Sequence, residues 1–214
     1  REHSLRAVGR KAMARNLSDC AAMAVRPLAV TVSVALSESM TEEDVREFYR
    51  GILEISASFD VAIAGGDTAR WTGPLGIDVT IIAEPFGDVG PVRRAGAREG
   101  DGLYVTGKLG GSRLGRHMTF TPRVREAQAL AEFFLDRLHA MIDISDGLSL
   151  DLWRICRASG VGAQVDKSQL EAAASDDAGR AAKASGRRLM DHALNDGEDH
   201  ELLMAICGEV NDSR

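Results

Sequence analysis

The pattern of hydrophobic and polar positions predicts alternating helices and strands along the first half of the chain. Residues 28–36 alternate between apolar and polar or small side chains, which is typical of a strand with one buried face. Thr41 is followed by three acids, so we expect a helix to begin there, because a hydroxyl caps free N–H groups and acids suit the positive end of the helix dipole. The buried face of the strand would carry Val30, Val32, Val34 and Leu36. The predicted elements are helices at 11–25 and 42–59 and strands at 28–36, 61–64 and 75–84.

A stretch rich in Gly and Pro, from Pro85 to Pro91, separates this half from the next. We place a domain boundary there, which divides the chain into 1–88 and 89–214. Residues 171–188 have a weak pattern, which leaves a surface helix or a mobile loop open. The other predicted elements are strands at 102–107, 141–144, 162–166 and 201–206 and helices at 123–139 and 148–158. Alternating strands and helices in both halves indicate an α/β or α+β fold.

Composition and charge exclude several classes of protein. Hydrophobic residues make up 44% of the chain, which allows a substantial core, and the net charge of −6 argues against a nucleic-acid binder, which needs a basic face. No apolar run approaches the roughly 18 residues of a membrane span. Three distant cysteines without a CxxC spacing indicate reduced thiols in a cytoplasmic protein. The chain has no initiator Met and stops without closing an element, so we expect it to be incomplete at both ends.

The first candidate for chemistry is the segment Gly65–Gly66–Asp67–Thr68, which follows a predicted apolar strand. Glycine lets the backbone turn sharply and lets a ligand approach its N–H groups. An aspartate beside such a turn can hold a hard cation through oxygen. The alternative is a simple strand-to-turn segment in which Asp67 caps a bend.

A second segment, from Asp143 to Leu148, carries two aspartates three residues apart where a strand gives way to a helix. A helix N-terminus attracts phosphate, and the two acids would bind that phosphate through a metal. The alternative is that Ser145 or Asp146 caps the helix, which explains one acid better than two. Asp19 and the pair Glu198–Asp199 also fit this style, with a solvent-facing acid and an exposed acidic turn as their alternatives.

Other common sites are missing from the sequence. It contains no GxxxxGK[ST], no GxGxxG after a strand, no HExxH and no GxSxG. The five histidines are scattered, and we expect most of them at the surface. Trp71 and Trp153 are interpreted as packing residues.

Taken in order, the motifs resemble the thiamine-monophosphate kinase family, in the superfamily that includes aminoimidazole ribonucleotide synthetase and selenophosphate synthetase. The resemblance implies a two-domain fold: an N-terminal α+β domain whose sheet pairs with that of a second copy in a homodimer, and a C-terminal α/β domain. It also implies direct transfer of the γ-phosphoryl group of ATP to thiamine monophosphate with Mg²⁺, without a covalent protein nucleophile. The matching segments are GRKAMARNLSDCAAMAVRP, FYRGILEISASFDVAIAGGDTAR, RRAGAREGDGLYVTGKLG, TPRV, MIDISDGLSLDL and DGEDHELL.

The same resemblance assigns roles to individual residues. Glu198 would hold the thiamine substrate. The implied Mg²⁺ ligands are Asp19, Asp67, Asp143 and Asp146. The residues implied to contact ATP are Tyr49, Gly66, Asp67, Arg94 and Ser145.

The chain also departs from the family pattern. An upstream Gly-Asp-Asp-Ala segment with further metal ligands is not in this sequence, nor is a C-terminal stretch with an aromatic residue for the substrate. Asp196, His200 and Ala24 stand where the family usually has Gly, Tyr and Gly. Three alternatives stay open: another enzyme of the superfamily, a nucleotide-binding relative without catalysis, and a structural dimerisation protein.

Overall fold

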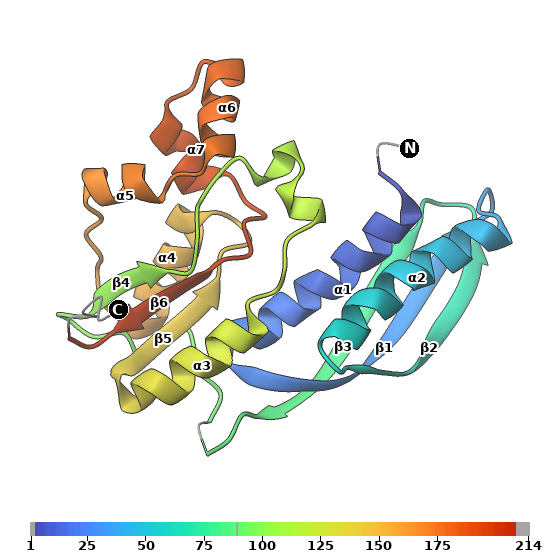
Figure 1. Cartoon of the computed structure of the whole chain (residues 1–214), viewed down its shortest axis with the longest axis horizontal. Helices are drawn as coiled ribbons and strands as arrows, with labels where there is room; N and C mark the ends of the chain where they lie inside the picture. Colours follow the sequence, from blue (N-terminus) through green and yellow to red (C-terminus); the bar gives the residue numbers. More distant parts are fainter. Residues whose placement is uncertain (1–2, 89, 209–214) are drawn as a thin grey trace.

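The first sheet has β1 (Val25–Ser37) at its centre, between β2 (Ala62–Trp71) and β3 (Gly76–Pro85). In this computed structural model, which describes residues 3–88 and 90–208, β1 runs parallel to β2 and antiparallel to β3. A parallel pair needs a crossover connection, and α2 (Glu42–Ser58) supplies it. With α1 (Leu5–Ala22), α2 covers one face of the sheet (Figure 1). The predicted buried face of β1 is confirmed, because Val30, Val32, Val34 and Leu36 are all buried.

The opposite face of this sheet is largely open to solvent. Ser33 pairs with Asp67 on one side and with Asp78 on the other, so these three polar residues form a row across the face away from the helices. Strand β2 is exposed along most of its length, and Ile82 of β3 has 57% of its surface exposed. A wide face of small, polar and some apolar side chains therefore remains uncovered in this chain.

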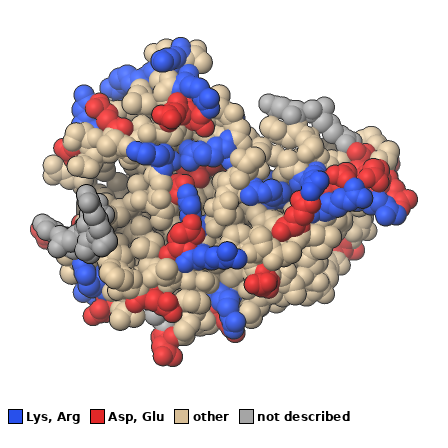
Figure 2. Space-filling model, viewed as in Figure 1, with Lys and Arg blue, Asp and Glu red and all other residues tan. Residues whose placement is uncertain are grey.

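Local sequence explains both ends of α2. Thr41 and Asp44 form a reciprocal capping box, which confirms the helix start. At the other end Asp60 adopts a left-handed conformation with φ of 56°, and the N–H of Val61 returns to the carbonyl of Ser56. Figure 2 shows Lys/Arg and Asp/Glu interspersed over the outer surface of α2, where Arg46 pairs with Glu42, Arg50 with Glu47 and Arg6 with Glu54.

The second sheet is antiparallel, with β6 (Leu202–Ile206) between β4 (Gly102–Val105) and β5 (Leu138–Asp143). Helix α3 (Val124–Phe134) lies on the side that faces α1, and α4 (Leu148–Ser159) follows β5 on the other side (Figure 1). The remaining helices are α5 (Lys167–Ala173), α6 (Asp176–Ser185) and α7 (Leu189–Asn195), with single 3₁₀ turns at Ser112–Leu114, Arg116–Met118 and Leu135–Arg137.

The hydrophobic core joins the two sheets. Strand β6 is buried on both faces, and its side chains alternate between two clusters as the period of a strand requires. Leu202, Met204 and Ile206 belong to the cluster that also holds Leu17 of α1 and Val30 of β1, whereas Leu203 and Ala205 face α4 and the later helices. Helix α1 is thus packed between the first sheet and the second, and its side chains contact both.

Several predicted elements are wrong in extent. The strand expected at 61–64 continues through Gly65 and Gly66 to Trp71, because pairing with β1 keeps the glycines extended. Residues 162–166 have no strand partner and do not form a strand. The helix expected at 123–139 ends at Phe134, and the chain then enters β5. Residues 171–188 are mostly helical, in α5 and α6.

Some residue-level expectations are also wrong. His192 and His200 are buried rather than at the surface. Burial is tolerated because each ring pairs with a carboxylate, His192 with Asp196 and His200 with Asp143. The packing role of Trp71 and Trp153 stays a prediction, and each leaves about half of its surface exposed, 47% and 51%. No helix among the described residues has the length and apolar character needed to cross a bilayer.

Candidate functional site

The carboxylate of Asp143 lies at the end of β5, where the two sheets meet around α1. Its side chain is buried, and it accepts a hydrogen bond from the hydroxyl of Ser18 at 2.7 Å. His200 Nδ1 lies 3.4 Å from the same oxygen, Oδ2. Ser18 and Asp143 are 125 positions apart in sequence, so only the packing of α1 on β5 brings this pair together.

Asp19, the next residue of α1, faces the same region. Asp19, Arg94 and Asp143 all line a cavity of about 470 Å³. Asp19 is an exposed residue overall, yet its carboxylate is partly shielded by this wall, and that burial together with the charge of Asp143 raises its pKa. Two carboxylates that repel each other beside an arginine form a donor set suited to a hard divalent cation and a phosphate.

The turn after β5 is held by a buried aspartate. The backbone N–H groups of Ser145 and Asp146 both donate to Asp151, at 3.1 and 3.0 Å, and Asp151 is fully buried. Arg154 pairs with Asp151 and with Asp146, each at 2.6 Å. Gly147 takes the cap position of α4 and no side chain caps the helix, so the alternative of Ser145 or Asp146 as a simple cap is wrong.

A second turn, 196–200, packs directly on the first. The N–H of Glu198 donates to the carbonyl of Ser145 and that of His200 to Ile144, both at 2.8 Å. A Cβ on Gly197 would lie 2.6 Å from the Ser145 carbonyl oxygen, so only glycine fits this approach. The two predicted motifs are thereby locked into one structural unit.

Glu198 is the most strongly perturbed acid of this unit. It lies 2.8 Å from Lys11 Nζ and 3.4 Å from His200 Nε2. The hydrogen bond with His200, followed by that with Lys11, lowers the pKa of Glu198 to about 2. Burial alone would lower the pKa of His200, but its hydrogen bonds with Asp143 and Glu198 raise it. The ring of His200 stacks on Phe120 with centroids 4.1 Å apart, which fixes its plane.

Two further acids, Asp199 from the predicted acidic pair and Glu201, which the sequence pattern did not single out, are also buried here. Asp199 accepts hydrogen bonds from the N–H of Gly110, the hydroxyl of Ser112 and the guanidinium of Arg116 at 2.8, 2.6 and 2.9 Å. Glu201 forms a two-bond ion pair with Arg123. The expected exposed acidic turn is therefore wrong for Asp199, which orders the glycine-rich loop after β4.

Three of the residues implied by the resemblance lie elsewhere. Asp67 is on the open face of the first sheet, opposite the helices. Gly66 is needed by the sheet itself, because its φ is 154° and a Cβ would lie 1.9 Å from the Val32 carbonyl oxygen. Tyr49 of α2 is half-buried, packs edge-on against Phe48, and lines none of the three cavities that Asp19 borders.

The four implied metal ligands do not form one compact set in this chain. Within residues 3–88 and 90–208, no three of Asp19, Asp67, Asp143 and Asp146 have ligand atoms within 4.8 Å of one another. Asp19 and Asp143 share a cavity, Asp146 is held by Arg154, and Asp67 lies apart.

Comparison with known families agrees with this architecture. Residues 3–84 match the AIR synthase related protein N-terminal domain, and residues 95–214 match the C-terminal domain of the same family. The chain belongs to the AIR synthase related proteins. The predicted fold class, α/β resembling aminoimidazole ribonucleotide synthetase, is confirmed.

Individual AIR synthase related proteins resemble the chain over most of its length. It is 46% identical to the thiamine-monophosphate kinase of Rhodopirellula baltica, which covers 97% of this chain and 64% of that protein. It is 36% identical to the enzyme of Salmonella typhimurium, over 92% of this chain and 63% of that one. The chain thus spans slightly less than two thirds of these curated relatives.

Solved structures also resemble this chain in fold. The thiamine monophosphate kinase of Aquifex aeolicus superimposes with a TM-score of 0.86 at 26% identity, covering 99% of this chain and 76% of that one. The structure of AaThiL complexed with AMPPCP and TMP has a TM-score of 0.80 at 26% identity, covering 96% and 70%. Hydrogenase maturation protein HypE, at 17% identity and a TM-score of 0.78, shares the fold.

Proposed function

We propose that this chain carries the binding centre of a thiamine-monophosphate kinase, which transfers the γ-phosphoryl group of ATP to thiamine monophosphate and yields thiamine diphosphate. The observation that carries the proposal is the 46% identity to the Rhodopirellula baltica enzyme over 97% of this chain. AMPPCP, an ATP analogue, and TMP are the ligands in the related AaThiL complex. The arrangement of Asp19, Arg94 and Asp143 around one cavity supports the same proposal.

We infer that Mg²⁺ binds at this centre through Asp19 and Asp143, and we propose Asp146 and Asp67 as further Mg²⁺ ligands of the protein. Burial, and after it the negative charge of Asp143, raises the pKa of Asp19, and a divalent cation beside both carboxylates would favour their ionised forms. Asp146 must release Arg154 to reach a cation, and Asp67 rests on the family resemblance alone. When bound, Mg²⁺ neutralises the repulsion between two phosphate-bearing substrates.

The protein side chains would then position the reactants. Arg94 offers a guanidinium to the phosphates of ATP beside Asp19 and Asp143, and Ser145, Gly66 and Tyr49 remain proposed ATP contacts. The low pKa of Glu198 keeps it ionised beside Lys11 and His200, and we propose that this carboxylate holds the cationic thiamine substrate. Direct in-line transfer needs alignment more than a nucleophile. The nearby thiol of Cys20 is unsuited to attack, because burial raises its pKa to about 12.

The proposed partners follow from the surface. A homodimer would cover the open face of β1, β2 and β3, which is otherwise exposed. We also propose a cytoplasmic enzyme without nucleic-acid or membrane partners, in view of the net charge of −6 and the free thiols at Cys20, Cys156 and Cys207. We propose that the chain divides into domains 1–88 and 89–214. The two family matches, over residues 3–84 and 95–214, support this division.

Turnover of thiamine monophosphate by the protein in its full reading frame tests the proposal. We expect thiamine diphosphate only when ATP and Mg²⁺ are both present. Asp143→Asn with Asp146→Asn should abolish Mg²⁺-dependent ATP binding in calorimetry, whereas the exposed pair Asp136→Asn with Asp176→Asn should bind normally. Product formation from selenide or formylglycinamidine ribonucleotide instead would assign the chain to another reaction of the superfamily.

A nucleotide-binding relative without catalysis is the second candidate. It is favoured by the scattered positions of the four aspartates within the described residues. Calorimetry with Mg²⁺ and ATP, paired with a turnover assay on the same sample, separates the two. Tight binding without turnover supports this second candidate.

A further inference from the structure

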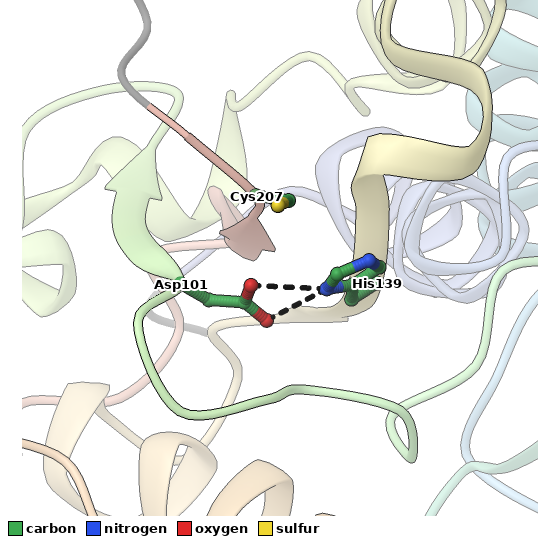
Figure 3. A group of neighbouring side chains, drawn as sticks. All are labelled: Asp101, His139 and Cys207. Atoms are coloured by element: carbon green, nitrogen blue, oxygen red, sulfur yellow. Dashed lines mark hydrogen bonds and ion pairs between the residues drawn. The ribbon is translucent and has the colours of Figure 1, made fainter.

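A separate cluster of metal-binding side chains lies at the other end of the second sheet. Asp101 precedes β4, His139 lies near the start of β5, and Cys207 follows β6 (Figure 3). One ligand atom from each residue falls within 4.8 Å of the other two. His139 and Asp143 are four residues apart on one strand, roughly 13 Å along it. This cluster therefore lies well away from the proposed nucleotide site.

The strand register produces the cluster. Gly102 and Leu138 both pair with Ile206 across the central strand, so the neighbouring residues Asp101 and Cys207 come together at the sheet end. The pairing of β5 with β6 shifts between Leu138 and Ala140, which makes His139 the extra residue of a β-bulge. Bulges redirect a side chain out of its regular alternation and are frequent at functional sites.

Hydrogen bonds fix the side chains of Asp101 and His139 and the backbone of Cys207. His139 Nδ1 lies 3.0 and 2.9 Å from the two oxygens of Asp101, and both side chains are more than nine-tenths buried. Asp101 also accepts the N–H of Arg98 at 2.7 Å. The backbone of Cys207 is fixed by Arg137, because the Cys207 N–H donates to the Arg137 carbonyl and the Cys207 carbonyl accepts from Arg137 Nε, both at 2.9 Å. Cys207 itself is exposed, which gives an ion a path into the site.

We propose that Asp101, His139 and Cys207 form a binding site for a transition-metal dication, with Zn²⁺ as the best fit. A thiolate, an imidazole and a carboxylate are the donors that Zn²⁺ takes in proteins, whereas Mg²⁺ prefers oxygen alone. Tetrahedral Zn²⁺ with bonds of about 2.0–2.3 Å places its donors roughly 3.3–3.7 Å apart, so small side-chain rotations suffice. Water takes the fourth position.

Binding changes the protonation of the site in a defined way. Cys207 gives its thiol proton to solvent, and His139 binds through Nδ1 as the tautomer protonated at Nε2. The hydrogen bond between His139 and Asp101 is replaced by a bond from each residue to the ion. The metal then links the ends of β4, β5 and β6, and so stabilises the second sheet.

Cobalt(II) titration of the chelator-treated, reduced protein tests the site, because a thiolate ligand gives a sulfur-to-cobalt charge-transfer band and a tetrahedral site gives intense visible bands. We expect both to saturate at about one Co²⁺ per chain, to vanish on addition of Zn²⁺, and to persist in excess Mg²⁺. Cys207→Ser should remove the charge-transfer band. Cys156→Ser, the matched control at a half-buried thiol outside the cluster, should keep it.

Affinity and thermal stability provide a second readout. Asp101→Asn and His139→Gln should each weaken Zn²⁺ binding at least tenfold, and Zn²⁺ should raise the Tm of the wild type and of Cys156→Ser but not of Cys207→Ser. A wild type without the charge-transfer band, or a band retained in Cys207→Ser, would overturn the proposal and leave Asp101–His139 as a structural hydrogen bond. Mg²⁺-dependent ATP binding should be unchanged in Cys207→Ser, so this outcome is independent of the proposed kinase activity.

Discussion

At the scale of single residues, structural and chemical roles coincide at several positions. Gly66 belongs to a motif that the family resemblance connects with ATP, yet the close approach of Val32 already requires a glycine there. Glu198 is proposed to hold substrate, and it also carries two hydrogen-bonded contacts of the fold. The effect of a substitution at such a residue must therefore be compared with that of a control variant that tests the structural role alone.

Gly66→Ala should destabilise the protein by about 2–4 kcal/mol, because its Cβ would overlap the Val32 carbonyl in addition to straining the backbone. Gly65→Ala is the matched control, since Gly65 has a φ of 155° but no atom within 4 Å of the added Cβ. Urea unfolding of both variants measures the difference. Equal losses would mean that φ alone, and not the contact with β1, requires glycine.

Glu198→Gln should weaken the dependence of the free energy of unfolding on pH in the acid range. The carboxylate has its pKa lowered to about 2 in the fold, so it contributes stability above its ordinary value of 4.5 and loses that contribution as the pH falls through about 2. The variant should be less stable by on the order of 2–3 kcal/mol at neutral pH, with the difference shrinking toward pH 2. Glu132→Gln, at an exposed acid on α3, serves as control. A pH-independent difference would argue against the ion pair.

At the scale of elements, local signals placed the starts of α2 and α4 correctly, but α1 begins at Leu5 rather than at the expected residue 11, and strand ends were also misplaced. Thr41 and Asp44 begin α2 where expected, because a capping box involves only neighbouring residues. The extent of β2 depends instead on its ladder with β1, which carries the strand through Gly65 and Gly66. Residues 162–166 show the converse, since a strand-like pattern without a partner stays irregular.

Asp60→Gly should raise stability by about 0.5–1 kcal/mol. Asp60 ends α2 at a φ of 56°, where glycine is favoured, and its charge opposes the negative end of the helix dipole. Asp60→Ala removes the charge but keeps the strained conformation. Thermal unfolding that shows equal gains for Ala and Gly would attribute the effect to charge.

At the scale of the whole molecule, one hydrophobic cluster spans both sheets through α1. Leu17 and Val30 share that cluster with Met204 and Ile206. If either sheet unfolded, the other would expose part of this shared core. The two family regions are therefore expected to behave as one cooperative structure.

Unfolding followed at Trp71 and at Trp153 should give a single midpoint. Trp71 reports on the first sheet and Trp153 on α4, and each is about half exposed. The Trp153→Phe variant keeps only Trp71 as a fluorescent reporter, and Trp71→Phe keeps only Trp153. Neither change removes a residue of the shared core. Coincident urea transitions by fluorescence and circular dichroism would support cooperativity. Two separated midpoints would show that the units unfold independently.

The sequence by itself determined the buried face of β1, the start of α2, the α/β class and the order of the acidic motifs. These features follow from side-chain periodicity and from groups close together along the chain. Asp143, Glu198 and Asp19 could be nominated in this way, although their partners could not.

Only the tertiary structure decided how those acids are used. The contacts of Ser18 with Asp143 and of Lys11 with Glu198 join α1 to turns more than 100 residues away, and the bulge at His139 depends on pairing with β6. Folding also places Asp67 on the open face of the first sheet, whereas Asp19 belongs to α1 on the covered face. Periodicity records whether a position is buried but not which distant segment buries it, because that depends on how whole helices and strands pack.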